Sequence, residues 1–171
     1  MKRLFLLRHA KAVRTAGVDD HARPLSPRGI WAAEAMAEHC GARLHAVDVT
    51  LCSSAIRTRE TLRPFERHLP RSSKIVVDDA LHGAGSRVLM AALRRLGDRS
   101  KTALLVGHEP GLSDLVERLC GGEGKARAQR RLAKGFKTGS LAVLDLDIDR
   151  WRALRPGVGR LRALTRPKDL S

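Results

Sequence analysis

Arginine and histidine residues follow three of the apolar segments in this sequence. Arg8 and His9 come directly after the apolar run Leu4–Leu7, where a buried strand would leave its sheet. Arg57 begins a predicted helix behind a second apolar segment, and His108 follows a third. Two guanidinium and two imidazole groups suit a doubly charged oxyanion, because the guanidinium fork matches phosphate oxygens bidentately. These residue types therefore predict a phosphoryl-binding pocket.

The same residue types could also transfer the phosphoryl group. A neutral imidazole can attack phosphorus and later release the phosphoryl group to water, which divides one difficult displacement into two. Because the transition state places negative charge on the equatorial oxygens, catalysis consists mainly of placement and electrostatic stabilisation. Cationic side chains supply that stabilisation, so we expect no metal ion and no other cofactor.

The apolar patterns predict alternating strands and helices. Strands are expected at residues 2–8, 47–52, 75–77, 103–106, 140–147 and 158–164. Helices are expected at 27–40, after Ser53 or Ser54 up to Pro64, from Ser86 toward Gly97, and at 112–120, with a basic loop at 123–139. This alternation predicts one domain, residues 1–171, with a three-layer α/β/α fold. Its sheet has about five to six strands, mostly parallel, with later strands pairing antiparallel.

The predicted topology also explains how distant residues could meet. Arg8, His9, Arg57 and His108 all lie at the carboxyl ends of predicted strands. In wound α/β sheets, ligands bind at this edge. We therefore expect the four side chains to converge.

Four motifs resemble one known family. They are LLRHA at 6–10, DHARPLSPRG at 20–29, SSAIRTRET at 53–61 and VGHEPG at 106–111. In this order they resemble the histidine phosphatase superfamily, with its phosphoglycerate mutase-like fold, and within it the small SixA-type phosphohistidine phosphatases. The resemblance extends from Lys2 to about Leu146. One departure is Ala10, where the superfamily usually has glycine; a Cβ there requires a negative φ.

The resemblance implies a role for each matching residue. His9 would be the nucleophile that accepts the phosphoryl group, and Arg8 and Arg57 would bind its oxygens. His108 matches the second histidine of the pocket. Ser53 is interpreted as a cap of the helix that carries Arg57 rather than as a substrate contact.

The general acid is harder to assign. Larger relatives place a glutamate four residues before a glycine in the loop after the third strand, and Asp79 before Gly83 has that spacing. Asp78, His82 and Glu109 are alternatives, and Asp79 could equally be a surface turn residue. A phosphohistidine substrate needs an acid less than an alkyl phosphate does, because its leaving imidazole has a conjugate acid of pKa about 6.5.

Charge and composition limit the partners. The chain has 33 Lys and Arg against 18 Asp and Glu, a net charge of +15, which favours anionic partners. The stretches Lys125–Lys137 and Arg150–Lys168 are especially basic, as a polyanion-binding surface would be. Only 3% of residues are aromatic and none is tyrosine, which argues against stacking on single-stranded nucleic acid. We interpret these stretches as a basic rim that attracts anionic substrates.

The remaining signals concern the cellular compartment. Cys40, Cys52 and Cys120 are odd in number and far apart, which is typical of reduced thiols. No apolar run approaches the roughly 20 residues of a membrane span, and the first apolar segment is too short for a signal peptide. We expect a cytoplasmic protein without membrane association.

Together these signals predict a phosphatase that acts through phospho-His9, with phosphohistidine in proteins as the expected substrate. Phosphate or sulfate should bind in the same pocket. Two alternatives remain open: a phosphatase of small phosphoesters or phosphoanhydrides on the same fold, and a polyanion-binding module whose pocket is catalytically idle.

Overall fold

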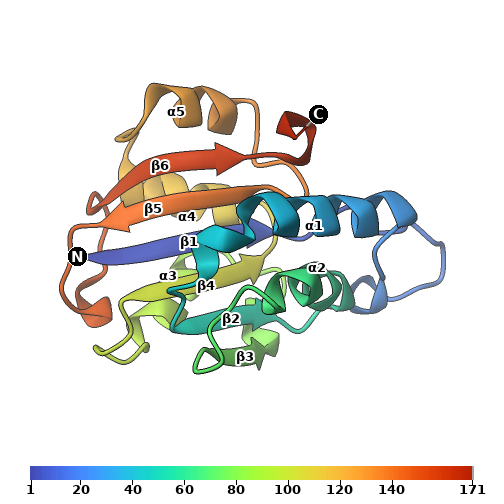
Figure 1. The fold of residues 1–171 in the computed structure, drawn as a ribbon, viewed down its shortest axis with the longest axis horizontal. Coiled ribbons are helices and arrows are strands. Elements are labelled where there is room, and N and C mark those ends of the chain that lie inside the picture. The colour runs from blue at the N-terminus through green and yellow to red at the C-terminus, as the bar shows by residue number, and fades with distance from the viewer. Residues whose placement is uncertain (171) are drawn as a thin grey trace.

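A six-stranded mixed sheet forms the centre of the computed structural model, which describes residues 1–170 (Figure 1). The strand order is β3-β2-β4-β1-β5-β6. The strands are β1 (Lys2–Arg8), β2 (Val49–Ser53), β3 (Lys74–Asp78), β4 (Thr102–Gly107), β5 (Leu141–Leu146) and β6 (Gly159–Thr165). Strands β1 to β4 run parallel to one another. Strand β5 pairs antiparallel with β1, and β6 pairs antiparallel with β5. The predicted α/β fold with a mostly parallel sheet is confirmed.

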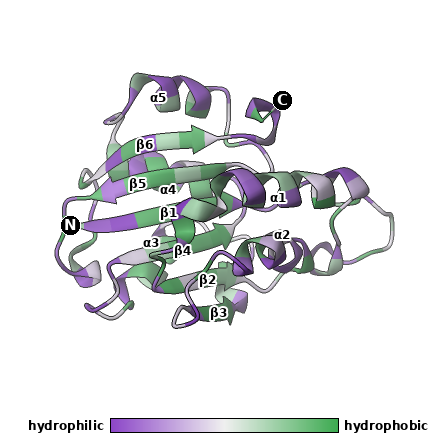
Figure 2. Ribbon diagram, in the orientation of Figure 1, coloured by the Kyte–Doolittle hydropathy of each residue, from purple (hydrophilic) through white to green (hydrophobic). Residues whose placement is uncertain are grey.

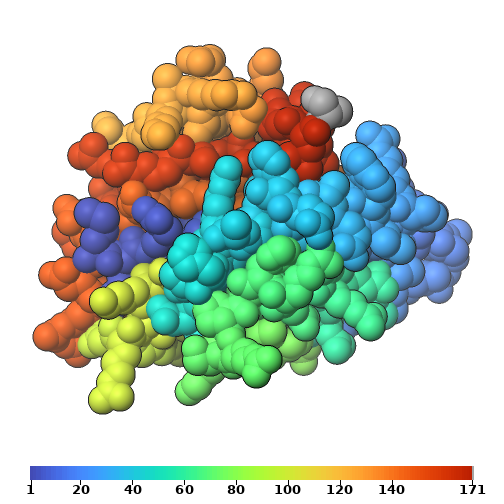
Figure 3. Space-filling view, in the orientation of Figure 1, coloured from blue at the N-terminus to red at the C-terminus, as the bar shows by residue number. Residues whose placement is uncertain are grey.

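Helices cover both faces of this sheet. They are α1 (Pro27–Cys40), α2 (Ile56–Glu66), α3 (Ser86–Arg94), α4 (Gly111–Cys120) and α5 (Ala126–Ala133). Helices α1 and α2 share one apolar cluster with the sheet, and α3 and α4 share the other. In Figure 3 the side chains of α1 and α2 cover the middle of the near face. The three layers follow from this division.

Strand β1 lies inside the sheet and is buried on both faces. Phe5 and Leu7 belong to the cluster with α1 and α2, whereas Leu4 and Leu6 belong to the cluster with α3 and α4. Successive side chains of a strand point to opposite faces, so burial on both faces requires a continuous apolar run. Figure 2 shows this hydrophobic concentration on the central strands. The opening apolar run therefore fixes where Arg8 and His9 emerge.

Two predicted elements differ from the structure. The region predicted as a basic loop contains helix α5, in which Ala128 is buried and Leu132, one turn later, packs against the same cluster. The apolar residues of this helix are three alanines and one leucine among several cations, and their spacing is too weak a helical period to predict the helix. Helix α2 was expected to end or kink at Pro64, but it continues to Glu66. Proline removes only one hydrogen bond, and the helix ends within a turn of it.

Two further features of residues 1–170 are the state of the cysteines and the character of the helices. Cys40, Cys52 and Cys120 are buried and unpaired. None of the helices in this range combines the length and the apolar character that crossing a membrane requires.

A close contact joins the segment after β1 to the start of α1. Ser26 caps α1 by accepting a hydrogen bond from the Gly29 amide, and the Ser26 amide donates to the Lys11 carbonyl at 2.8 Å. A Cβ on Gly29 would lie 2.1 Å from that carbonyl oxygen. This position therefore requires glycine.

We expect Gly29→Ala to lower the free energy of unfolding by about 1–3 kcal/mol, because a backbone oxygen must move to admit the methyl group. Urea denaturation of the purified variant measures this change. Gly97→Ala is the matched control, since a Cβ at Gly97 meets nothing within 4 Å. Equal stability of the two variants would contradict the assigned contact.

Candidate active site

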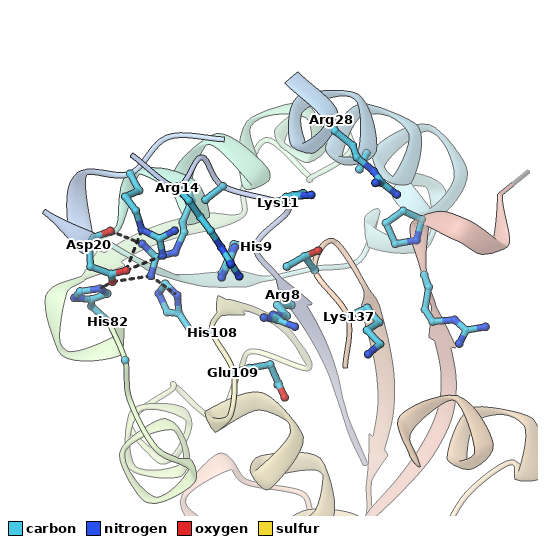
Figure 4. Close-up of a pocket in the computed structure, with 18 of the residues that line it drawn as sticks. Arg8, His9, Lys11, Arg14, Asp20, Arg28, His82, His108, Glu109 and Lys137 are labelled. Carbon is cyan, nitrogen blue, oxygen red and sulfur yellow. Dashed lines mark hydrogen bonds and ion pairs between the residues drawn. The ribbon is translucent and has the colours of Figure 1, made fainter. Parts of the chain in front are cut away.

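A pocket of about 940 Å³ opens at the carboxyl ends of the parallel strands (Figure 4). Arg8, His9, Arg57 and His108, the four residues predicted to converge, all line it. Its wall also carries seven further lysine and arginine residues but just two acidic ones, Asp20 and Glu109. The additional cations are Lys11, Arg14, Arg23, Arg28, Lys137, Arg166 and Lys168. The pocket is therefore strongly cationic.

Backbone contacts at the end of β1 orient His9. The Nδ1 atom of His9 lies 2.7 Å from the Ala10 carbonyl oxygen. Because a carbonyl oxygen can only accept, Nδ1 carries the proton and donates it, and Nε2 keeps its lone pair. Ala10 itself has no positive φ, and its amide donates to Oγ1 of Thr61 at 2.9 Å. The Cβ of Ala10 is thus compatible with this turn.

Arg57 is buried at the start of α2 and links two other segments. Its Nη1 donates to the Asp20 carbonyl at 2.5 Å, and its Nη2 donates to Oδ2 of Asp20 at 3.0 Å. Nη2 also lies 3.2 Å from Nδ1 of His108. Since a guanidinium group can only donate, Nδ1 of His108 accepts this hydrogen bond.

The second nitrogen of His108 contacts Ser53. Nε2 of His108 therefore carries the proton and donates it to Oγ of Ser53 at 2.8 Å. The residue preceding α2 is Ala55, and no side chain caps the helix. The interpretation of Ser53 as a helix cap is wrong: its hydroxyl accepts from the Ala55 amide at 3.4 Å, ahead of the helix, and from Nε2 of His108, which it orients. The signal was the buried end of β2, which delivers Ser53 to the same edge as His108.

Both arginines keep donors without a partner. Arg8 donates from Nη1 to the Phe136 carbonyl at 2.7 Å. The Nε atoms of Arg8 and Arg57 are buried and make no hydrogen bond to any part of residues 1–170. A buried donor left unpaired costs free energy.

The two histidines are uncharged at neutral pH. The pKa of His9 is lowered to about 4. Burial is the main cause and the charges of Arg57 and Arg8 contribute, whereas the hydrogen bond to the Ala10 carbonyl opposes the shift. Burial likewise lowers the pKa of His108 to about 3, with the neighbouring His9 and Arg57 adding to it. The two rings lie 5.2 Å apart between centroids. The site thus holds a neutral imidazole with a free lone pair among fixed cations.

Asp20 is a residue whose importance the sequence did not reveal. Its carboxylate accepts hydrogen bonds from Arg23 at 2.7 Å, from Arg57, and from Nε2 of His82 at 3.0 Å. Arg23 and then His82 hold the pKa of Asp20 well below its usual range. The available signal was the motif DHARPLSPRG, which begins at Asp20.

The structure does not bring Asp79 to the pocket. Asp79 is exposed at the start of a short 3₁₀ turn that buries Leu81, and the same loop instead places His82 and Gly83 in the wall. The geometry of the turn decides whether Asp79 reaches the pocket, and the spacing of residues in the sequence does not determine that geometry. Of the alternatives, Asp78 accepts from the Ala80 amide, and Glu109 lines the pocket while it accepts from the amide and hydroxyl of Ser113.

Within residues 1–170, no group of three or more His, Cys, Asp or Glu side chains is arranged to hold a metal ion.

Comparison with known proteins identifies the family. Residues 4–84 match the model of the histidine phosphatase superfamily, branch 1. The uncharacterized protein MT1313 of Mycobacterium tuberculosis is 36% identical over 156 residues, which cover 91% of this chain and 96% of that protein.

Solved structures agree with this match over nearly the whole chain. A candidate phosphohistidine phosphatase SixA from Nakamurella multipartitia is 31% identical, with a TM-score of 0.83 and coverage of 97% of this chain and 96% of that one. The protein histidine phosphatase SixA complexed with tungstate shares the fold at 24% identity, with a TM-score of 0.78 and coverage of 99% of each chain. The chain belongs to the histidine phosphatase superfamily.

Proposed function

We propose that this protein is a metal-independent phosphatase that forms a phosphohistidine intermediate on His9 and removes phosphoryl groups from phosphohistidine in proteins. The observation that carries the proposal is the neutral imidazole of His9, whose Nε2 lone pair is available among Arg8, Arg57 and His108. A neutral imidazole is the form that can attack phosphorus.

The reaction proceeds in two displacements. Nε2 of His9 forms a bond to phosphorus while the bond to the leaving group breaks, and the leaving group takes up a proton. Water then attacks the phosphoryl group on His9, loses a proton, and restores the neutral imidazole as phosphate departs. Arg8 and Arg57, which both line the pocket, donate hydrogen bonds to the equatorial oxygens in both steps.

Two observations favour phosphohistidine over an alkyl phosphate. The expelled imidazole has a conjugate acid of pKa about 6.5, so it departs without a strong general acid. Asp79 lies outside the pocket, the Glu109 carboxylate is engaged by Ser113, and His82, which lines the pocket, donates from Nε2 to Asp20. A structural neighbour, the protein histidine phosphatase SixA, forms a complex with tungstate, which is an oxyanion.

An exposed aromatic residue favours a substrate carried on a protein. Trp31 is 62% exposed on α1, one turn from Arg28, which lines the pocket. Exposed tryptophan beside a binding site is typical of protein contact surfaces, because it buries a large apolar area at little entropic cost. The cationic rim would at the same time attract an acidic protein surface.

Purified protein should dephosphorylate a phosphohistidine protein faster than sugar phosphates or an aryl phosphate, and His9→Ala should abolish turnover. Arg57→Ala should reduce kcat by roughly a hundredfold to a thousandfold, as loss of one preorganised oxyanion donor does. Rapid acid-free quenching with labelled substrate should trap the phosphoryl group on His9.

Three outcomes would argue otherwise. Higher activity on small phosphates would favour a small-molecule phosphatase, and a phosphoryl adduct on another residue would exclude His9 as nucleophile. Absence of turnover, together with tight and steeply salt-dependent binding to nucleic acid, would favour a polyanion-binding module.

The protonation state of His9 gives an independent prediction. Its ring should stay neutral as the pH falls from 8 to 5 and titrate near pH 4, because its pKa is lowered to about 4. Proton NMR of the ring hydrogens in phosphate-free buffer, assigned with His9→Asn, measures this midpoint. The urea-unfolded chain should titrate near pH 6.5. A midpoint near 6.5 in the folded protein would contradict the assigned effect of burial and of the neighbouring guanidinium charges on the pKa of His9.

Trp31→Ala should lower kcat/KM for a phosphohistidine protein by roughly tenfold, as expected for a contact of moderate strength, and leave activity on an aryl phosphate unchanged. Val88→Ala, at an exposed position on α3, serves as control. Equal effects on both substrates would show that Trp31 is not a protein contact.

A further inference from the structure

A second cavity, of about 420 Å³, is lined by the C-terminal end of α1, by α5 and by β6. On the near face in Figure 3, β6 lies between α5 and α1. The cavity has one carboxylate, Asp169, against five lysine and arginine side chains, which are Arg43, Lys125, Arg127, Arg131 and Arg162. A concave site with this excess of cations attracts an anionic ligand.

Most of these cations have no carboxylate partner in the folded chain. Arg131 lies 3.3 Å from Asp169, and Arg162 lies 2.8 Å from Asp145. Asp169 also pairs with Arg166 at 2.8 Å, so the acidic group of the cavity is already engaged. The three cations that form no ion pair with any of residues 1–170 are Arg43, Lys125 and Arg127. An anion bound between them would relieve their mutual repulsion.

The second cavity is a neighbour of the active-site pocket. Residues 166–168 line the active-site pocket, whereas Thr165 and Asp169, at the two ends of the same segment, line the second cavity. Helix α1 likewise contributes Arg28 to the first and His39 to the second. One ligand could therefore occupy both sites by crossing the wall that they share.

We propose that the second cavity binds an acidic segment of the same protein whose phosphohistidine enters the active-site pocket. The inference rests on the proposed function and narrows its substrate class to phosphohistidine proteins with nearby acidic residues. Arg28 and His39 are separated by about 17 Å along α1, at 1.5 Å per residue. Because an extended chain covers about 3.3 Å per residue, the acidic residues should lie at least about five residues from the phosphohistidine.

The lining favours a peptide over other anions. Ala128, Ala163 and Leu164 give the cavity an apolar part, which the methylene groups of glutamate side chains can contact and a bare phosphate ion cannot. Arginine forks also bind carboxylates bidentately. His39 is the one lining residue with a ring, so the cavity lacks the aromatic surface on which nucleic-acid bases stack.

Binding can be measured without catalysis. An unphosphorylated peptide with six consecutive glutamates should shift the backbone amide signals of α5 and β6 in proton–nitrogen NMR spectra, and these shifts give a dissociation constant for the second cavity alone. Arg127→Glu and Arg43→Glu should each raise that constant about fivefold, the upper range for an exposed ion pair.

Arg87→Glu is the matched control and should leave the constant unchanged. Arg87 and Arg127 are both exposed second residues of a helix, and Arg87 lines neither site. A glutamate in the first turn suits the helix dipole, so both variants should fold. Equal weakening by all three variants would reveal an effect of net charge and overturn the proposal. Shifts confined to the active-site pocket would also overturn it, as would tighter binding of a DNA duplex than of the peptide at α5 and β6.

Kinetics test whether the cavity serves the substrate. Phosphohistidine peptides with glutamates six to eight residues from the phosphohistidine should have a lower KM than peptides with serines there. Arg127→Glu should raise the KM of the glutamate peptides about fivefold with kcat unchanged. Equal KM values for the two peptide series would overturn the link to the substrate. Dephosphorylation of neither series would contradict the proposed function, whereas the NMR titration would still decide whether the cavity binds an acidic segment.

Discussion

The buried guanidinium of Arg57 is the interaction on which the site depends. It joins the loop after β1, through Asp20, to the end of β4, through His108, while its own backbone begins α2 after β2. Three segments distant in sequence are thereby held around one charge. A buried arginine without these acceptors would be costly, so the contacts that orient it also hold the pocket wall together.

Burial and positive charge act in the same direction on the histidines. Desolvation disfavours an imidazolium ion, and nearby guanidinium groups disfavour it further, so His9 and His108 both have lowered pKa values. An anion experiences the opposite effect, since the same cations attract it. The site therefore combines two properties that a phosphoryl-transfer nucleophile needs, a neutral lone pair and a positive surrounding potential.

The sheet places the neutral histidines and the surrounding cations at the same edge. Because β1, β2 and β4 are parallel neighbours, their carboxyl ends meet at one edge, and each delivers part of the pocket. Their near-continuous apolar sequences made these strands easy to predict. Helix α5 was not predicted because its apolar face comprises little more than Ala128 and Leu132. The predicted cap at Ser53 was wrong because a serine just before a helix can bond either to the helix start or to another side chain, here His108.

The fold class and the four converging residues could be predicted before the structure was known, because apolar periodicity and the motifs around Arg8, His9, Arg57 and His108 are local patterns. Such patterns do not determine the tautomers of the two histidines, the bridging role of Asp20, or the position of Asp79. Those depend on which donor faces which acceptor across segments up to 62 residues apart, as in the contact between Asp20 and His82. Hydrogen bonds are short and directional, so these contacts become known when the folded chain fixes the distances between the segments.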